Sequence, residues 1–160
     1  MPEEWRRDGF LISTDPALLD LQVVHRWLSE SSYWVPGIPF DVVKRGIDGS
    51  LNFGLYGAGG EPQAGLARII TDYATFAYVC DVFVLDEYRG RGLGVWLMEC
   101  VAAHPRLQGL RRWMLGTKDA HSLYEKTGFT PVASPDRWME KADAEIYTRT
   151  AGYSSTTEDA

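Results

Sequence analysis

The segment Arg89–Gly94, RGRGLG, lies between an apolar run, VFVL, and a stretch with helical spacing, VWLMECVAAH. At the N-terminus of a helix several backbone N–H groups lack partners, and the helix dipole adds partial positive charge. Glycines let the chain curl so that these N–H groups converge on an anion, and Arg89 and Arg91 add charge. The segment therefore predicts a phosphate or pyrophosphate site. The alternative is a glycine-rich turn from strand to helix, with solvated arginines.

Two other phosphate-binding motifs are excluded. The pattern GxxxxGK[ST] is absent from the sequence, so the segment is not a nucleoside-triphosphate P-loop. A dinucleotide fold places GxGxxG near the start of a βαβ unit, with an acidic residue about 20 residues further on. Here the glycines come past the middle of the chain, and no such acid follows the strand expected at RRWMLGT.

Arg89-x-x-Gly92-x-Gly94 resembles the acyl-coenzyme A pyrophosphate loop, [Q/R]-x-x-G-x-[G/A], of the GNAT superfamily of N-acetyltransferases. Residues 120–129, AHSLYEKTGF, are similar to the second motif of that family, A-x-x-L-Y-E-K-x-G-F. One helix and one strand separate the two motifs, as in the family, and the resemblance covers residues 8–141.

The resemblance implies acetyl-CoA as cosubstrate, no metal, and direct attack of a primary amine on the thioester. In the family, a backbone N–H on the strand before the loop polarises the thioester carbonyl. A bulge in that strand splays it from RRWMLGT and opens a slot for the pantetheine arm. The cofactor-binding residues implied in this way are Val82, Phe83, Val84, Arg89, Gly90, Arg91, Gly92, Leu93, Gly94, Val95, Thr117 and Tyr124.

Two positions depart from the family pattern. Seven residues before the motif tyrosine, family members often carry Asn, and here that residue is Thr117. The family base is often a Glu on the strand before the loop, whereas this strand offers only Asp81. These changes bear on the catalytic details rather than on the cofactor.

Tyr124 and Asp81 are the candidate catalytic residues. A phenol with a pKa of about 10 is protonated at neutral pH and can pass its proton to the leaving thiolate. The alternative for Tyr124 is a core tyrosine whose hydroxyl meets a carbonyl. Asp81 is a candidate base, directly or through water. Because an unpaired carboxylate in an apolar strand is costly, a structural partner such as an arginine explains Asp81 equally well.

The acceptor amine is expected to meet His121, Tyr33, Trp34 and Phe40. His121 precedes Tyr124 by one helical turn, although a surface histidine is the simpler interpretation. The aromatic loop SYWVPGIPF lies where the family places its lid over the acceptor. Its prolines and aromatic rings suit a pocket wall, and the alternative is a loop that caps the core.

The expected fold class is α/β, a GNAT-like mixed and mostly antiparallel twisted sheet flanked by helices, in the order β-α-α-β-β-β-α-β-α-β. Strands are expected in GFLIST, on both sides of the turn at residues 57–62, in TFAYVCDVFVL, in RRWMLGT and in FTPVASPDRWMEK. Helices are expected from Pro16 to Ser29, in FDVVKRGID, over residues 92–103 and in DAHSLYEKTG. The N-acetyltransferase domain would span residues 8–145, followed by a polar, flexible tail over residues 146–160.

Composition and charge limit the kinds of partner and the location that we expect. The 160-residue chain has a formal charge of −6, which argues against nucleic acid. No apolar run approaches the roughly 20 residues of a membrane span, and no signal peptide precedes the domain, so a cytoplasmic location is the default. Cys80 and Cys100 are expected as buried reduced thiols, the alternative being a disulfide or redox pair.

The expected partner is a small-molecule or peptide amine. Dimers are common in the family, so a homodimer is an alternative to a monomer. Two alternatives to an active enzyme stay open: a non-catalytic acyl-CoA-binding or regulatory module on the same fold, and a phosphate-binding structural protein.

Overall fold

A computed structural model describes residues 1–149 of the chain. These residues divide into two compact units. The first comprises residues 1–20 and 49–130, and the second comprises residues 21–48 together with the described residues after 130. Each unit is described by itself.

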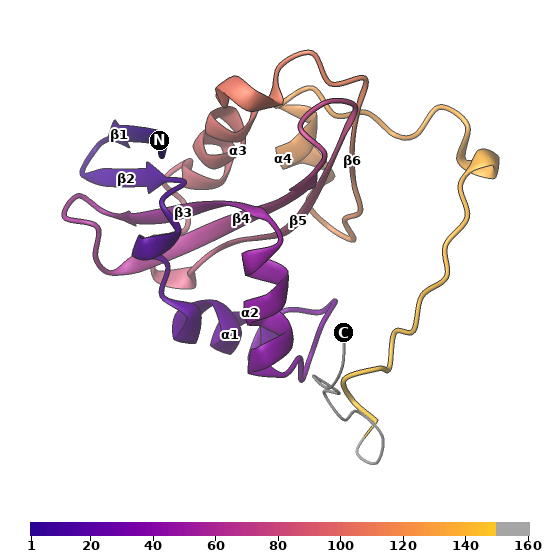
Figure 1. Cartoon of the computed structure of the whole chain (residues 1–160), viewed down its shortest axis with the longest axis horizontal. Coiled ribbons are helices and arrows are strands. Elements are labelled where there is room, and N and C mark those ends of the chain that lie inside the picture. The colour runs from indigo at the N-terminus through magenta and orange to yellow at the C-terminus, as the bar shows by residue number, and fades with distance from the viewer. Residues whose placement is uncertain (150–160) are drawn as a thin grey trace. The chain divides into compact units, whose positions relative to one another are not determined.

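The first unit contains a six-stranded sheet whose strands lie side by side in their order along the chain (Figure 1). Neighbouring strands are antiparallel except for β5 and β6, which are parallel and are connected through helix α3. This mixed, mostly antiparallel α/β sheet confirms the expected fold class. The strands are β1 (Glu4–Arg7), β2 (Phe10–Ser13), β3 (Leu51–Gly57), β4 (Gln63–Thr71), β5 (Phe76–Val84) and β6 (Arg112–Leu115).

Strand β1 was not expected from the sequence. It pairs with β2 through a two-residue turn, and both turn residues, Asp8 and Gly9, have positive φ angles of 50° and 81°. Asp-Gly is a preferred sequence for such a turn because both positions tolerate left-handed backbone. The residues before Asp8 are mostly polar, so they do not show the alternation of a strand. Only Trp5 gives β1 an apolar side chain toward the core, and it stacks on Phe53 with ring centroids 6.0 Å apart.

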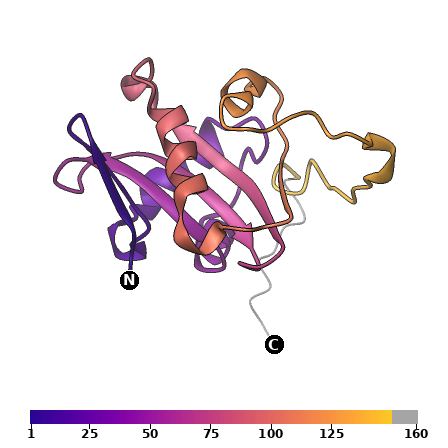
Figure 2. The ribbon, with the colours of Figure 1, turned by 90° about the horizontal axis from the view of Figure 1, so that it is seen from above.

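Helix α3 (Leu93–Ala103) lies across one face of the sheet, as Figure 2 shows. The expected apolar face of this helix, Leu93, Trp96, Leu97, Cys100 and Val101, is buried, and so is Met98. These side chains form one core with alternate residues of the central strands, among them Phe53, Leu55, Ala67 and Val79. Successive side chains of a strand point to opposite faces, so the residues between these core positions face away from α3.

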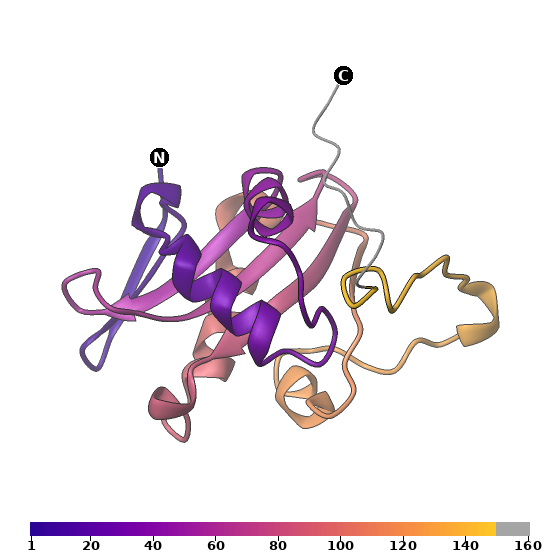
Figure 3. The same cartoon turned by 90° about the horizontal axis from the view of Figure 1, so that it is seen from below.

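The second unit contains helices α1 (Leu21–Glu30) and α2 (Phe40–Asp48), which pack against each other (Figure 3). Helix α2 forms where expected. The helix expected from Pro16 is divided: Asp15 Oδ1 accepts from the Ala17 N–H at 2.9 Å and caps a 3-10 turn, η1 (Pro16–Leu18). Leu19 is extended, with φ −65° and ψ 129°, so α1 starts separately at Leu21.

The strand expected in residues 129–141 is wrong: no strand forms there in the part of the chain that the structure describes. The segment contains a 3-10 turn, η4 (Pro135–Arg137). Pro131 and Pro135 have no N–H to donate to a ladder, which opposes a paired strand here. Helix α4 (His121–Glu125) is present but ends before Gly128. The remaining 3-10 turns are η2 (Asp86–Tyr88) and η3 (Pro105–Leu107). Most of the expected tail, residues 150–160, lies outside the described residues.

Within residues 1–149, no helix is both long enough and apolar enough to span a bilayer.

Candidate active site

Strand β5 carries a bulge at Asp81. Leu66 of β4 pairs with Phe83, but Arg68, two residues later, pairs with Cys80. Asp81 and Val82 therefore lie opposite the single residue Ala67, which is the two-against-one arrangement of a β-bulge. Asp81 has a φ of 48°, in the left-handed region. The bulge forms in the strand where the resemblance implies one.

The pairing of the two parallel strands ends just before the bulge. β6 pairs with β5 only from Phe76 to Val79, where Val79 meets Leu115, the last residue of β6. β5 continues to Val84 beyond that pairing. The backbone of residues 82–84 is therefore not paired to β6.

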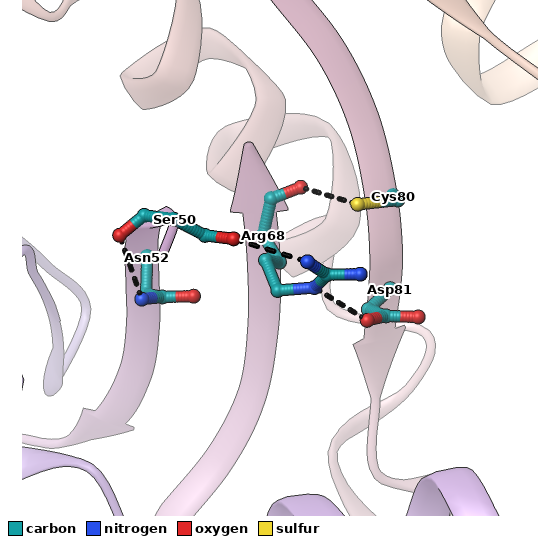
Figure 4. A network of polar contacts seen from close by, with 5 residues as sticks. All are labelled: Ser50, Asn52, Arg68, Cys80 and Asp81. Atoms are coloured by element: carbon teal, nitrogen blue, oxygen red, sulfur yellow. Dashed lines mark hydrogen bonds and ion pairs between the residues drawn. The ribbon is translucent and has the colours of Figure 1, made fainter. Parts of the chain in front are cut away.

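Polar side chains line the face of the sheet that points away from α3, next to the bulge (Figure 4). Arg68 Nε donates to Asp81 Oδ2 at 2.6 Å, and Arg68 Nη1 donates to Ser50 Oγ at 3.0 Å. The Cys80 thiol donates to the Arg68 carbonyl oxygen at 3.4 Å. Arg68 was not among the residues expected from the sequence. Of the two roles left open for Asp81, the one that involves an arginine partner is present.

The glycine loop after β5 has the backbone geometry of an anion site. Gly90 and Gly92 have φ angles of 79° and 72°, and a Cβ at either position would meet no atom within 4 Å. Gly92 is the N-cap of α3, so the loop leads directly into the unpaired N–H groups of the first helical turn. Arg89 connects the loop to the end of β5 and to η2: its Nε donates to the Val84 carbonyl at 3.1 Å, and its Nη1 lies 3.2 Å from Asp86 Oδ1.

The β1–β2 hairpin brings a third arginine to this loop. Arg7 Nη2 donates to the carbonyl of Gly92, 85 residues further along the chain, at 3.5 Å. On β2, the Phe10 ring lies 5.9 Å from the Arg91 guanidinium and meets Tyr88 edge-on at 6.0 Å. The sequence offers no signal for the approach of Arg7, because nothing in the spacing relates β1 to the loop.

Helix α4 packs on the start of α3 and carries Tyr124. A Cβ on Gly94 would lie 2.9 Å from Leu123 Cδ1, which shows how closely the two helices approach. Tyr124 is half-buried, meets Phe129 edge-on at 6.0 Å and packs on the same core as Val82 and Val84. The structure thus brings Tyr124 and the strand end after the bulge to one core.

Thr117 and His121 flank the start of α4. Thr117 Oγ1 accepts from the Ala120 N–H at 3.0 Å and so orders the turn into the helix. His121, the first residue of α4, is exposed.

The aromatic residues expected at the acceptor lie in the second unit. Tyr33 and Trp34 meet edge-on with centroids 4.9 Å apart, and Trp34 also contacts Trp27 at 5.4 Å. Phe40 does not join them but meets His25 edge-on at 5.5 Å. Tyr33 is exposed.

Neither cysteine is in a disulfide: Cys80 is half-buried and Cys100 is buried. Burial raises the pKa of both thiols to about 12. Among residues 1–149, no group of three or more His, Cys, Asp or Glu is placed to hold a metal ion. A cavity of about 400 Å³ lies elsewhere in the first unit, near Leu107, Trp113 and Phe129, and none of the candidate site residues lines it.

The bulged strand, the end of the β5–β6 pairing and the glycine loop are consecutive features of one mixed α/β sheet and the helix that follows it. Residues 53–131 match the model of the Acetyltransferase (GNAT) domain family. A protein of Gibberella zeae, FG08082, whose name places it among acetyltransferases, is 37% identical over 145 residues, covering 78% of this chain and 81% of that protein. The chain belongs to the GNAT acetyltransferase family.

Solved structures agree with this assignment. The crystal structure of a Xanthomonas campestris pv. campestris protein described as a GNAT-family acetyltransferase is 50% identical, with a TM-score of 0.84, over 88% of this chain and 98% of that one. A GNAT family acetyltransferase from Elizabethkingia anophelis, solved with acetyl-CoA bound, shares the fold at 14% identity and a TM-score of 0.59, over 84% of this chain and 88% of that one.

Proposed function

We propose that this protein is an N-acetyltransferase that moves an acetyl group from acetyl-CoA to a primary amine by direct attack. One observation carries the proposal: the bulge at Asp81 and the left-handed glycines Gly90 and Gly92 follow one another on the same strand and loop. The proposed sites for the carbonyl and the pyrophosphate would therefore lie in the order that an acyl-CoA molecule requires.

The loop would hold the pyrophosphate of acetyl-CoA. The N–H groups of residues 90–95 supply donors, the α3 dipole adds partial positive charge, and Arg91 adds a full one. The pantetheine arm would run beside β5, where β6 has ended. The backbone N–H groups of residues 82–84 would then meet the thioester carbonyl and stabilise the charge that builds on its oxygen.

In the transfer step, the amine nitrogen attacks the carbonyl carbon and the carbon–sulfur bond breaks. The departing thiolate takes the proton of the Tyr124 hydroxyl, and the proton that the amine loses passes to solvent, from which Tyr124 is reprotonated. Two observations support Tyr124: its helix packs on the start of α3, and its ring shares a core with Val82 and Val84. Binding both substrates close together supplies much of the rate.

The test is thiol release from acetyl-CoA in the presence of a panel of amines: small amines, amino acids, aminoglycosides and peptides with a free N-terminus or lysine. Cys80 is half-buried, Cys100 is buried, and both thiols have raised pKa values, so a thiol reagent reports coenzyme A over a low background. We expect release that depends on at least one class of amine. Binding of acetyl-CoA without release for any amine would instead support the non-catalytic acyl-CoA-binding module.

A further inference from the structure

Arg68 on β4 forms an ion pair with Asp81, the residue at the bulge of the neighbouring strand β5. Its Nε lies 2.6 Å from Asp81 Oδ2, and the two side chains are only 19% and 11% exposed. The pair lies on the face of the sheet away from α3, because the flanking residues Ala67 and Ile69 belong to the α3 core. Such a shielded, charge-assisted hydrogen bond is stronger than an exposed ion pair.

The residue that Arg68 holds has a strained backbone. Asp81 has a φ of 48°, a region that non-glycine residues seldom occupy. Aspartate tolerates this conformation better than most residues, since its short polar side chain bonds locally. Strained conformations at functional sites persist only when their surroundings hold them. The bond from Arg68 is such a restraint, because it fixes the side chain of the strained residue itself.

Arg68, which belongs to β4, also bonds to residues on both sides of that strand. Its Nη1 donates to Ser50 Oγ, one residue before β3, at 3.0 Å, and its carbonyl accepts from the Cys80 thiol of β5 at 3.4 Å (Figure 4). The raised pKa of Cys80, which burial causes, keeps that thiol protonated and so a donor. The guanidinium therefore has little freedom to release Asp81.

We propose that Arg68 is a positioning residue: by holding Asp81 in its left-handed conformation, it aims the backbone N–H groups of residues 82–84 at the thioester carbonyl. This inference rests on the proposed function. In this role Asp81 maintains the bulge in β5 and does not transfer a proton. Glycine adopts positive φ without a restraint, so a glycine at position 81 should make Arg68 largely dispensable.

The kinetic test uses Arg68→Met, Arg68→Lys, Asp81→Gly and the double variant Arg68→Met with Asp81→Gly. Arg68→Met should lower kcat about 10- to 100-fold, somewhat less than the loss of a whole oxyanion donor, and leave the KM for acetyl-CoA nearly unchanged. Arg68→Lys keeps the positive charge but not the planar guanidinium, so its kcat should fall less than that of Arg68→Met. The double variant should be faster than Arg68→Met alone, because it removes both the strain at position 81 and the carboxylate that Arg68→Met leaves without its arginine.

A measurement without an acceptor separates this inference from the proposed function. In ¹H–¹⁵N spectra of the 18.0 kDa protein, acetyl-CoA and coenzyme A should give different shifts for the amides of residues 82–84, because only acetyl-CoA carries the carbonyl. Arg68→Met should abolish that difference while the shifts of residues 90–95 persist. If the wild-type protein does not bind acetyl-CoA, the proposed function fails.

If binding is normal and Arg68→Met keeps the acetyl-specific shifts and the wild-type kcat, the positioning role is wrong. It is also wrong if Asp81→Gly abolishes turnover but keeps these shifts, since the carboxylate itself is then the essential group. Should Arg68→Met fail to fold, Arg68→Lys and the double variant decide in the same way.

Discussion

The guanidinium of Arg7 lies over the ring of Trp96, 4.7 Å from its centroid. Arg7 ends the first strand and Trp96 belongs to the first turns of α3, so this stack fixes a cation beside the N-terminus of that helix. A stacked arginine keeps its full charge, and the aromatic face adds a cation–π attraction. The hairpin thereby adds charge to a loop whose own sequence already contains two arginines.

Arg7→Gln should therefore weaken acetyl-CoA binding. The side chain is 41% exposed, so screening limits the loss to about 1 kcal/mol or less, up to about five-fold in Kd. The loss should shrink as salt is raised, because counterions screen an exposed charge. Titration calorimetry at two salt concentrations measures both effects.

Arg106→Gln is the matched control for Arg7→Gln. Arg106 also stacks on an aromatic ring, that of Tyr73 at 3.7 Å, but it lies in η3, beyond the C-terminal end of α3. A change in Kd as large for Arg106→Gln as for Arg7→Gln would show that the effect is net charge and not the site.

Gly92→Asp should weaken acetyl-CoA binding much more than Arg7→Gln. The change places a negative charge at the centre of the proposed anion site, where it repels the pyrophosphate. Gly92→Asn adds nearly the same volume without the charge and should be intermediate. Calorimetry on both variants separates the steric from the electrostatic part.

The control for Gly92→Asp is Gly109→Asp. Gly109 has nearly the same backbone, φ 74° against 72°, and a Cβ there also meets nothing within 4 Å. The two variants thus carry the same backbone strain. Equal Kd values for acetyl-CoA in the two variants would show that the glycine loop is not part of the binding site.

The sequence predicts best where one short stretch contains the whole signal. The end of β5 at Val84, the positive φ angles of Gly90 and Gly92 and the buried apolar face of α3 all arise from local patterns in the sequence. The same holds for the turn at residues 57–62, where Gly60 has a φ of 87°. Each of these depends on backbone freedom or on periodicity, which neighbouring residues reveal.

The sequence predicts less well where distant segments meet. The contact of Arg7 with Gly92 and the ion pair of Arg68 with Asp81 depend on sheet register, and no local pattern fixes a register across separate strands. For Asp81 the residues alone left a base and an arginine-bound carboxylate equally open, and only the pairing of β4 with β5 supplies the arginine. The strand expected in residues 129–141 does not form, because Pro131 and Pro135 have no N–H to donate to a ladder.

Tyr124→Phe should lower kcat and leave acetyl-CoA affinity nearly unchanged. The ring that packs on Phe129 stays, so folding should survive. Loss of a general acid costs about 100- to 10,000-fold in rate, or about 3 to 5 kcal/mol. Steady-state kinetics with an acceptor from the amine panel measure the change. Wild-type kcat in the variant would make Tyr124 a packing residue, and a collapse of affinity alone would make its hydroxyl a cofactor anchor.

His104 should make stability depend on pH. Its Nδ1 accepts from the Arg106 N–H at 3.1 Å, and its ring meets Phe53 edge-on at 5.6 Å. Burial lowers the pKa of His104, an effect that Glu3 opposes and Arg106 reinforces. The unfolded chain then binds a proton more readily than the folded one, so this contribution to stability is present above about pH 6.5 and is lost as the pH falls.

Denaturant unfolding of the wild type and of His104→Gln between pH 5 and pH 8 measures this effect, within about the range where histidine titrates. As the pH falls toward 5, the free energy of unfolding should decrease less in His104→Gln than in the wild type. His121→Gln is the control, because His121 is exposed at the start of α4. A variant of His104 with the pH dependence of the wild type would exclude this histidine as its source.

Transfer of a labelled acetyl group tests the central claim most directly. Acetyl-CoA labelled in its acetyl carbons is incubated with the protein and an amine, and the label in the amide product is counted against the thiol released. If the protein transfers acetyl groups as proposed, one labelled acetyl group appears on nitrogen for each coenzyme A released, and Tyr124→Phe greatly reduces the rate. Bound acetyl-CoA whose label reaches no amine would contradict it.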